Sequence, residues 1–173
     1  MWSHRIADAL RDRDEESAVV GSPFGARLYV ACDTQGIVAS RWTRAPTRDV
    51  AKRGDEALLG EAVRQLRAYF AGRLERFDVP LRLTGTPFEV AVWSAVAQLR
   101  TGTLISYADV ARAIGRPRAY RGVARALART PLALFIPAHR VVGADGRLKG
   151  ASAASLRRRL ITFESRLVRR RPS

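Results

Sequence analysis

The chain has 173 residues and a formal net charge of +15 at pH 7, and all but Lys52 and Lys149 of its 31 basic residues are arginine. This charge favours a polyanionic partner, of which nucleic acid is the commonest, although a solvated basic surface is the plainer alternative. The single cysteine, Cys32, excludes an internal disulfide, and the two histidines are scattered, so we expect neither a metal nor another cofactor.

Residues 1–20 mix charges with few large apolar groups, which indicates a frayed helix or arm rather than a signal peptide. No apolar run approaches the roughly 18 residues of a membrane-spanning helix. We therefore expect a cytoplasmic protein with no membrane partner.

A β-hairpin is predicted next, because apolar residues alternate over 28–32, turn residues occupy 33–36, and an apolar run follows at 37–39. Cys32 shares a strand face with Leu28 and Val30. This position favours a small buried hydrophobe over a reactive thiol.

Residues 43–54 indicate a loop, and helical spacing of apolar residues predicts a helix from Leu58 to Phe70, stopped by Gly72. The extended stretch at 77–81 marks a domain boundary. The predicted domains are residues 1–82 and 83–173.

Helix-start signals recur in the second half. Thr86-Pro87-Phe88-Glu89 predicts a helix up to Gly102, and Ser106-Tyr107-Ala108-Asp109 predicts a second helix up to Gly115. Arg116-Pro117 is expected to start a third helix that runs to about Arg129. The last two helices form a helix-turn-helix candidate.

The third predicted helix carries a stripe of basic residues at helical spacing: Arg118, Arg121, Arg125 and Arg129. Such a stripe is usually a solvated face. On the second helix of a helix-turn-helix candidate in so basic a chain, it favours contact with DNA.

Several motifs, in this order, resemble the O6-alkylguanine-DNA alkyltransferase family: Gly85-Thr86-Pro87-Phe88 with Val92-Trp93, Ile105-Ser106-Tyr107, Gly115-Arg116-Pro117, Arg121, and Ile136-Pro137-Ala138-His139-Arg140-Val141-Val142. The hairpin, the helix through 66–72 and Phe77-Asp78-Val79-Pro80 are similar to that family's N-terminal domain. The resemblance spans roughly residues 22–167. It implies an α+β fold with a small N-terminal α/β domain, made of an RNase H-like antiparallel sheet and a helix. A mostly helical, winged helix-turn-helix-like DNA-binding domain follows.

The resemblance also implies residue roles. Tyr107 would help to rotate the target nucleotide out of the duplex, Arg121 would fill the vacated space, and Glu164 would orient a histidine base. The resemblance places the helix that bears Arg121 in the minor groove of double-stranded DNA. The expected DNA contacts are Tyr107 and Arg121 from the resemblance, with Arg118, Arg125 and Arg129 from the basic stripe and Gly122 from the small residues beside it. The implied lesion pocket consists of Tyr107, Pro137, Ala138, Arg140, Val141 and Ser152.

In the family, the position of Ala138 holds the cysteine that takes the alkyl group, and alanine has no lone pair with which to attack. We therefore interpret Ala138, His139 and Glu164 as a vestigial catalytic site. The expected protein is a non-enzymatic, alkyltransferase-like monomer, cytoplasmic and nucleoid-associated. It would flip O6-alkylguanine, hold it, and pass the lesion to nucleotide-excision repair proteins.

Two alternatives stay open: a drifted DNA-binding protein without lesion preference, and a Cys-to-Ala form of an active alkyltransferase. Thr130 replaces an asparagine of the family, and residues 150–154 replace a loop that covers the base pocket. The small Ala138 leaves room for adducts larger than methyl.

Overall fold

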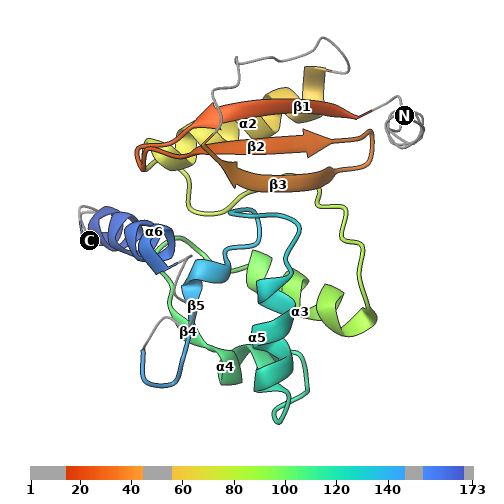
Figure 1. Ribbon diagram of the computed structural model, residues 1–173, viewed down its shortest axis with the longest axis vertical. Coiled ribbons are helices and arrows are strands. Elements are labelled where there is room, and N and C mark those ends of the chain that lie inside the picture. The colour runs from red at the N-terminus through yellow and green to blue at the C-terminus, as the bar shows by residue number, and fades with distance from the viewer. Residues whose placement is uncertain (1–14, 45–55, 147–153, 170–173) are drawn as a thin grey trace, which may run out of the picture.

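The computed structural model describes residues 15–44, 56–146 and 154–169. A three-stranded sheet with one helix across it forms the N-terminal part, and a mostly helical part lies beside it (Figure 1). The predicted α+β fold is therefore confirmed. The expected N-terminal arm, most of the loop at 43–54 and the loop at 150–154 fall wholly or largely outside the described residues.

The sheet is antiparallel, with strands β1 (Glu16–Gly21), β2 (Arg27–Cys32) and β3 (Ile37–Thr43) in sequence order. The predicted hairpin is confirmed as β2 and β3, with Ala31 opposite Ala39. Strand β1 was not predicted, since residues 1–20 were expected to form an arm. Its inward side chains, Ala18 and Val20, are small, so they gave a weak alternating signal.

Helix α2 (Glu56–Phe70) packs on the sheet through an apolar stripe: Leu59, Ala62, Leu66 and Tyr69 are buried. It ends as predicted, since Gly72 has a φ of +75°, a left-handed conformation that glycine adopts without strain.

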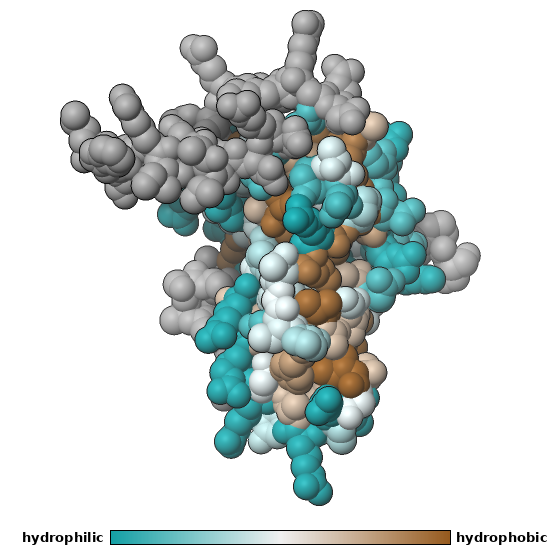
Figure 2. Space-filling model, turned by 90° about the vertical axis from the view of Figure 1, so that its right-hand side faces the viewer, coloured by the Kyte–Doolittle hydropathy of each residue, from teal (hydrophilic) through white to brown (hydrophobic). Residues whose placement is uncertain are grey.

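The extended linker after α2 runs along the start of β3. Ile37 donates its backbone N–H to Pro80 and accepts one from Arg82. Gly36 is needed at this crossing, because a Cβ there would lie 2.9 Å from the Pro80 carbonyl oxygen. On the side where the linker descends, hydrophobic residues form a central run between hydrophilic margins (Figure 2).

The helical part contains α3 (Pro87–Ala97), α4 (Tyr107–Ala113), α5 (Tyr120–Ala128) and α6 (Ala154–Arg169), with the short η1 (Ala138–Arg140) between α5 and α6. Strands β4 (Ile105–Ser106) and β5 (Val141–Val142) pair in parallel. Both predicted capping boxes are confirmed, at Thr86 and at Ser106. Helix α3 ends at Ala97, several residues before the predicted stop at Gly102.

Helix α5 also begins later than predicted, at Tyr120 instead of Arg116-Pro117. Gly115 has a φ of +71°, and Ala119 donates its N–H to the Arg116 carbonyl, so residues 116–119 form a turn. Arg118 therefore lies in this turn and not on the helix. Arg121 and Arg125 remain on the exposed side of α5.

Ser40 of β3 joins the two parts. Its N–H donates to the Pro131 carbonyl, its carbonyl accepts from Ala133, and its hydroxyl donates to the Ala133 carbonyl over 2.7 Å. Within the described ranges, no helix is both long and apolar enough to cross a membrane.

Candidate functional site

The segment between α5 and η1 turns the chain sharply into the core. Leu132, Leu134, Phe135 and Ile136 are buried, and Leu134 adopts a φ of +72°, which costs energy for a residue with a branched side chain. The turn carries Ala138 and His139 into the space between the two parts of the molecule.

His139 lies against Glu164 of α6, with 2.7 Å between Nε2 and the carboxylate Oε1. Both side chains are almost completely buried. Burial lowers the pKa of the His139 imidazole, so this ring is neutral near pH 7. Burial alone would raise the pKa of the Glu164 carboxyl, but hydrogen bonds from His139 and Arg140 outweigh it and hold that pKa well below its usual range.

These protonation states fix the tautomer of His139. Because the Glu164 carboxylate is ionised, it can only accept hydrogen bonds, so Nε2 carries the imidazole proton. Nδ1 is then the ring nitrogen that keeps a lone pair. A neutral histidine held in this way is suited to act as a general base.

Arg140 also serves Glu164. Its guanidinium donates to both carboxylate oxygens, with Nη2 at 2.8 Å from Oε1, and also to the Leu99 carbonyl and the Thr101 hydroxyl. Its side chain is 2 % exposed. The resemblance had assigned Arg140 to the lesion pocket, but its guanidinium points into the core and neutralises the buried carboxylate.

Two further groups bind Glu164. The hydroxyl of Tyr69, on α2, donates to Oε1 over 2.7 Å, and the backbone N–H of Gly102 donates to Oε2 over 2.9 Å. Sequence analysis missed both. Tyr69 was counted only in the apolar stripe of its helix, where nothing distinguishes a hydroxyl with a distant partner from one in the core.

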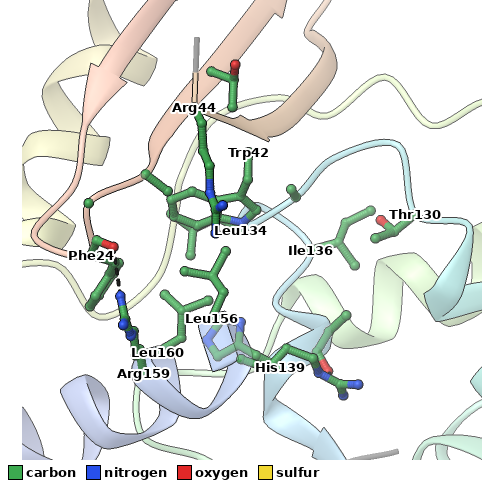
Figure 3. A pocket seen from close by; sticks show the side chains of 16 residues that line it. Phe24, Trp42, Arg44, Thr130, Leu134, Ile136, His139, Leu156, Arg159 and Leu160 are labelled. Atoms are coloured by element: carbon green, nitrogen blue, oxygen red, sulfur yellow. Dashed lines mark hydrogen bonds between the residues drawn. The ribbon is translucent and has the colours of Figure 1, made fainter. Parts of the chain in front are cut away.

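A cavity of about 730 Å³ adjoins this network and reaches across to the sheet (Figure 3). Ala138 and His139 lie at one side, and Leu134, Ile136, Leu156 and Leu160 supply apolar lining. Phe24, Trp42 and Arg44 face them from the N-terminal part. The hydroxyl of Thr130, also in the lining, is buried without a hydrogen-bond partner.

Of the residues expected in a lesion pocket, Ala138 lines this cavity. Tyr107, Pro137, Arg140 and Val141 are absent from its lining, and Ser152 lies outside the described residues. Val141 is fully buried, and it pairs with Ile105 in the short parallel sheet.

The expected DNA-contact residues lie around α4 and α5. Tyr107 begins α4, and Arg118, Arg121 and Arg125 are exposed. Arg129 is exposed but lies 3.8 Å from Glu89 of α3. Gly122 faces α3, since a Cβ there would lie 3.1 Å from the Phe88 ring. Its small size thus serves helix packing, and its expected contact with DNA stays a prediction.

Cys32 lies away from these groups, in the core of the sheet. It is 2 % exposed, and burial, reinforced by nearby carboxylates, raises the pKa of its thiol to about 11. The expectation of a buried hydrophobe fits this position. In the described part of the chain, no three histidine, cysteine or acidic side chains gather in a way that could hold a metal ion.

A helix-turn-helix with an arginine-bearing second helix, and a buried His–Glu pair that Tyr69 links to the sheet domain, define a DNA-binding protein with a potential base at its centre. The model of the 6-O-methylguanine DNA methyltransferase DNA binding domain matches residues 87–166, and that of the ribonuclease-like domain matches residues 17–83. The chain belongs to the 6-O-methylguanine DNA methyltransferase family.

Individual relatives agree. A methylated-DNA–protein-cysteine methyltransferase of Methanosarcina acetivorans is 43 % identical over 151 residues, which is 85 % of this chain and 96 % of the relative. The Mycobacterium tuberculosis O6-methylguanine methyltransferase has the same fold, with a TM-score of 0.76 and 34 % identity over 92 % of this chain and 96 % of that one. The same enzyme in complex with DNA gives a TM-score of 0.74 and 36 % identity over 87 % and 93 %.

These relatives correct the expectation of a non-enzymatic lesion sensor. They are named as methyltransferases, so the family to which this chain belongs is an enzyme family that repairs by alkyl transfer. The classification as a non-enzyme rested on one position, Ala138. The similarity extends over both domains, so membership of this enzyme family does not depend on that single residue.

Proposed function

We propose that this protein is of the type that repairs O6-alkylated guanine in duplex DNA by transferring the alkyl group to one of its own side chains. Position 138 is the proposed position of that acceptor side chain. On this proposal the chain is a Cys-to-Ala form of an alkyltransferase. The observation that carries it is the buried His139–Glu164 pair, held beside Ala138 at the edge of a cavity.

The arrangement suits the activation of a thiol. With Nε2–H bound to Glu164, Nδ1 of His139 can accept the thiol proton, directly or through water. The thiolate sulfur then attacks the alkyl carbon on O6, forming an S–C bond. The C–O bond breaks, and its electron pair stays on the guanine oxygen.

DNA is the proposed partner, bound by the surface around α4 and α5. Arg118, Arg121 and Arg125 are exposed there, as contacts with phosphates or a groove require. We further propose that Tyr107 and Arg121 assist the rotation of the target base out of the duplex, through the minor groove. Replacing either by alanine should then weaken binding to O6-methylguanine duplexes more than binding to unmodified ones.

The decisive experiment restores the sulfur. The Ala138→Cys variant is incubated with a duplex containing O6-methylguanine, and intact mass and peptide mapping locate any added methyl group. We expect a large gain in methylated protein over the parent chain, with the methyl group on residue 138. Ala138→Ser is the matched control, because its hydroxyl fits the same space but ionises far less readily.

A second substitution tests whether the thiol of Cys32 takes part in the transfer. Adding Cys32→Ser to the Ala138→Cys variant should leave the transfer rate unchanged, because the Cys32 thiol is buried and protonated. An Ala138→Cys protein that folds and binds the duplex but gains no methyl group would overturn the proposed function.

A further inference from the structure

Tyr69 places a hydroxyl from the N-terminal domain within the His–Glu site. Its side chain is fully buried, and its hydroxyl donates to Glu164 Oε1 over 2.7 Å although the two residues are 95 positions apart. No other described group of the sheet domain is seen bonded to this carboxylate. The tyrosine thus links the two domains at the group that orients His139.

The ring of Tyr69 is fixed by aromatic neighbours on three elements. Phe70 on its own helix, Phe77 in the linker and Phe163 on α6 have ring centroids 5.4, 5.5 and 5.7 Å from it. Phe163 also precedes Glu164 in the chain, so the packing that holds the ring also holds the backbone bearing the carboxylate. The hydroxyl therefore has little freedom to leave its partner.

The direction of this hydrogen bond is settled by charge. Burial, reinforced by the Glu164 carboxylate, raises the pKa of the Tyr69 hydroxyl far above its usual range, so the hydroxyl keeps its proton and donates. Oε1 then accepts from Tyr69, His139 and Arg140, while Oε2 accepts from Gly102 and Arg140.

The donors differ in what they can do. Arg140 supplies the charge that keeps Glu164 ionised, and Gly102 fixes Oε2. Tyr69 and Arg140 both donate to Oε1, the same oxygen that receives His139 Nε2–H. Tyr69 is the donor that reaches this oxygen from the sheet domain, and it limits rotation of the carboxylate away from the imidazole. If the carboxylate turned away, the imidazole proton could move between Nε2 and Nδ1. Nδ1 would then no longer keep the lone pair that makes it the base.

We propose that Tyr69 is a positioning residue of the transfer site: its hydroxyl holds Glu164 Oε1 so that His139 keeps its proton on Nε2 and its lone pair on Nδ1. This role in transfer rests on the function proposed above. It makes the N-terminal domain part of the site through one hydroxyl, and it acts through Glu164 and His139 without touching DNA.

The first test uses the protein as it is, with Ala138 retained. Nitrogen-15 NMR of the labelled full chain reports the His139 tautomer, assigned by comparison with His139→Gln. We expect the parent to hold one tautomer with the proton on Nε2, and Tyr69→Phe to show averaging of the two ring nitrogens. Tyr29→Phe is the matched control, since Tyr29 lies on β2 and its ring stacks with Arg41.

The second test uses the Ala138→Cys background. Adding Tyr69→Phe should raise the pKa of the introduced thiol and shift the rising limb of the transfer rate to higher pH. The rate near pH 7 should fall about tenfold while affinity for duplex DNA stays the same. Adding Tyr29→Phe should change neither property. If Tyr69→Phe only lowered the stability of the protein, the pH dependence of the transfer rate would not shift.

The outcomes separate the two proposals. Absence of methyl transfer in Ala138→Cys, with the His139 tautomer lost in Tyr69→Phe, overturns the proposed function and supports the positioning of His139. Normal transfer in Ala138→Cys, with tautomer and pH profile unchanged by Tyr69→Phe, overturns the inference about Tyr69. A fixed tautomer that survives Tyr69→Phe overturns that inference whether or not transfer occurs.

Discussion

Glu164 remains charged in a buried position because each of its oxygens accepts hydrogen bonds, from Tyr69, His139, Gly102 and Arg140. A buried carboxylate without such donors would take up a proton. Arg140 brings the only full positive charge that the described residues place on it, since His139 is neutral. The site therefore depends on the guanidinium as much as on the imidazole.

Removal of the guanidinium should be costly. Arg140→Met leaves the Glu164 carboxylate buried with its counter-charge gone, and we expect a loss of about 3–5 kcal/mol in the free energy of unfolding, measured with urea. Arg112→Met is the control, because both side chains of its ion pair with Asp109 are exposed and the pair should contribute little to stability. Equal losses in the two variants would contradict the role given to Arg140.

Both members of the His–Glu pair should make stability fall in acid. Burial lowers the pKa of His139 below its ordinary 6.5, so the unfolded chain binds a proton there first, and stability falls as the pH drops from about 6.5 through the folded pKa. Glu164 has a lowered folded pKa, so its contribution is present above its ordinary 4.5 and is lost as the pH falls through the folded value.

Urea unfolding at a series of pH values from 7.5 to 4 measures this dependence. In the interval from about pH 6.5 down to the folded pKa of His139, stability should fall with a slope of at most about 1.4 kcal/mol per pH unit for one group. His139→Gln should flatten that part of the curve. A parent curve that is level over this interval would refute the neutral state of His139.

At the scale of elements, the four arginines that the sequence pattern placed on one helical stripe lie in different surroundings around α5. Arg121 and Arg125 project from the helix, Arg118 lies in the preceding turn, and Arg129 at the C-cap lies near Glu89. A charge near a carboxylate of the same protein has less to gain from a phosphate. The four residues should therefore differ in their share of DNA binding.

Salt dependence of duplex binding measures this difference. Arg125→Ala should reduce the slope of log K against log salt concentration by about 0.9, the value expected when the protein neutralises one phosphate fewer. Arg129→Ala should reduce it by a smaller amount because Glu89 already compensates its charge. If Arg129→Ala changed the slope more than Arg125→Ala, the ion pair would not persist in solution.

Elements with local signals were predictable from the sequence, and tertiary arrangements were not. The capping boxes at Thr86 and Ser106 are contained within four residues, so their helix starts were correct. The start of α5 was misplaced because its N-cap, Ala119, makes no side-chain hydrogen bond that a sequence could reveal. Tyr69 and Arg140 bind a residue far along the chain, and no local pattern records such a partner.

At the scale of the whole molecule, the two domains share one buried network in addition to a linker. Tyr69 reaches Glu164, Ser40 of β3 bonds to the segment at 131–133, and Arg159 of α6 donates to the Phe24 carbonyl. Domains joined only by a linker move independently. These contacts instead predict that the sheet domain and the helical domain unfold together.

Native-state hydrogen exchange tests this coupling. The slowest amides of β2 and of α5 should report the same free energy of opening and the same dependence on urea, because both exchange through global unfolding. Ser40→Ala removes the hydroxyl bond to Ala133 and should lower both values equally, by about 1 kcal/mol. The control is Ser165→Ala, whose hydroxyl bonds only within α6, to the Thr162 carbonyl. If Ser40→Ala lowered protection in β2 but left α5 unchanged, the domains would be separate folding units. The Tyr69 hydroxyl could then leave Glu164 without unfolding of the helical domain.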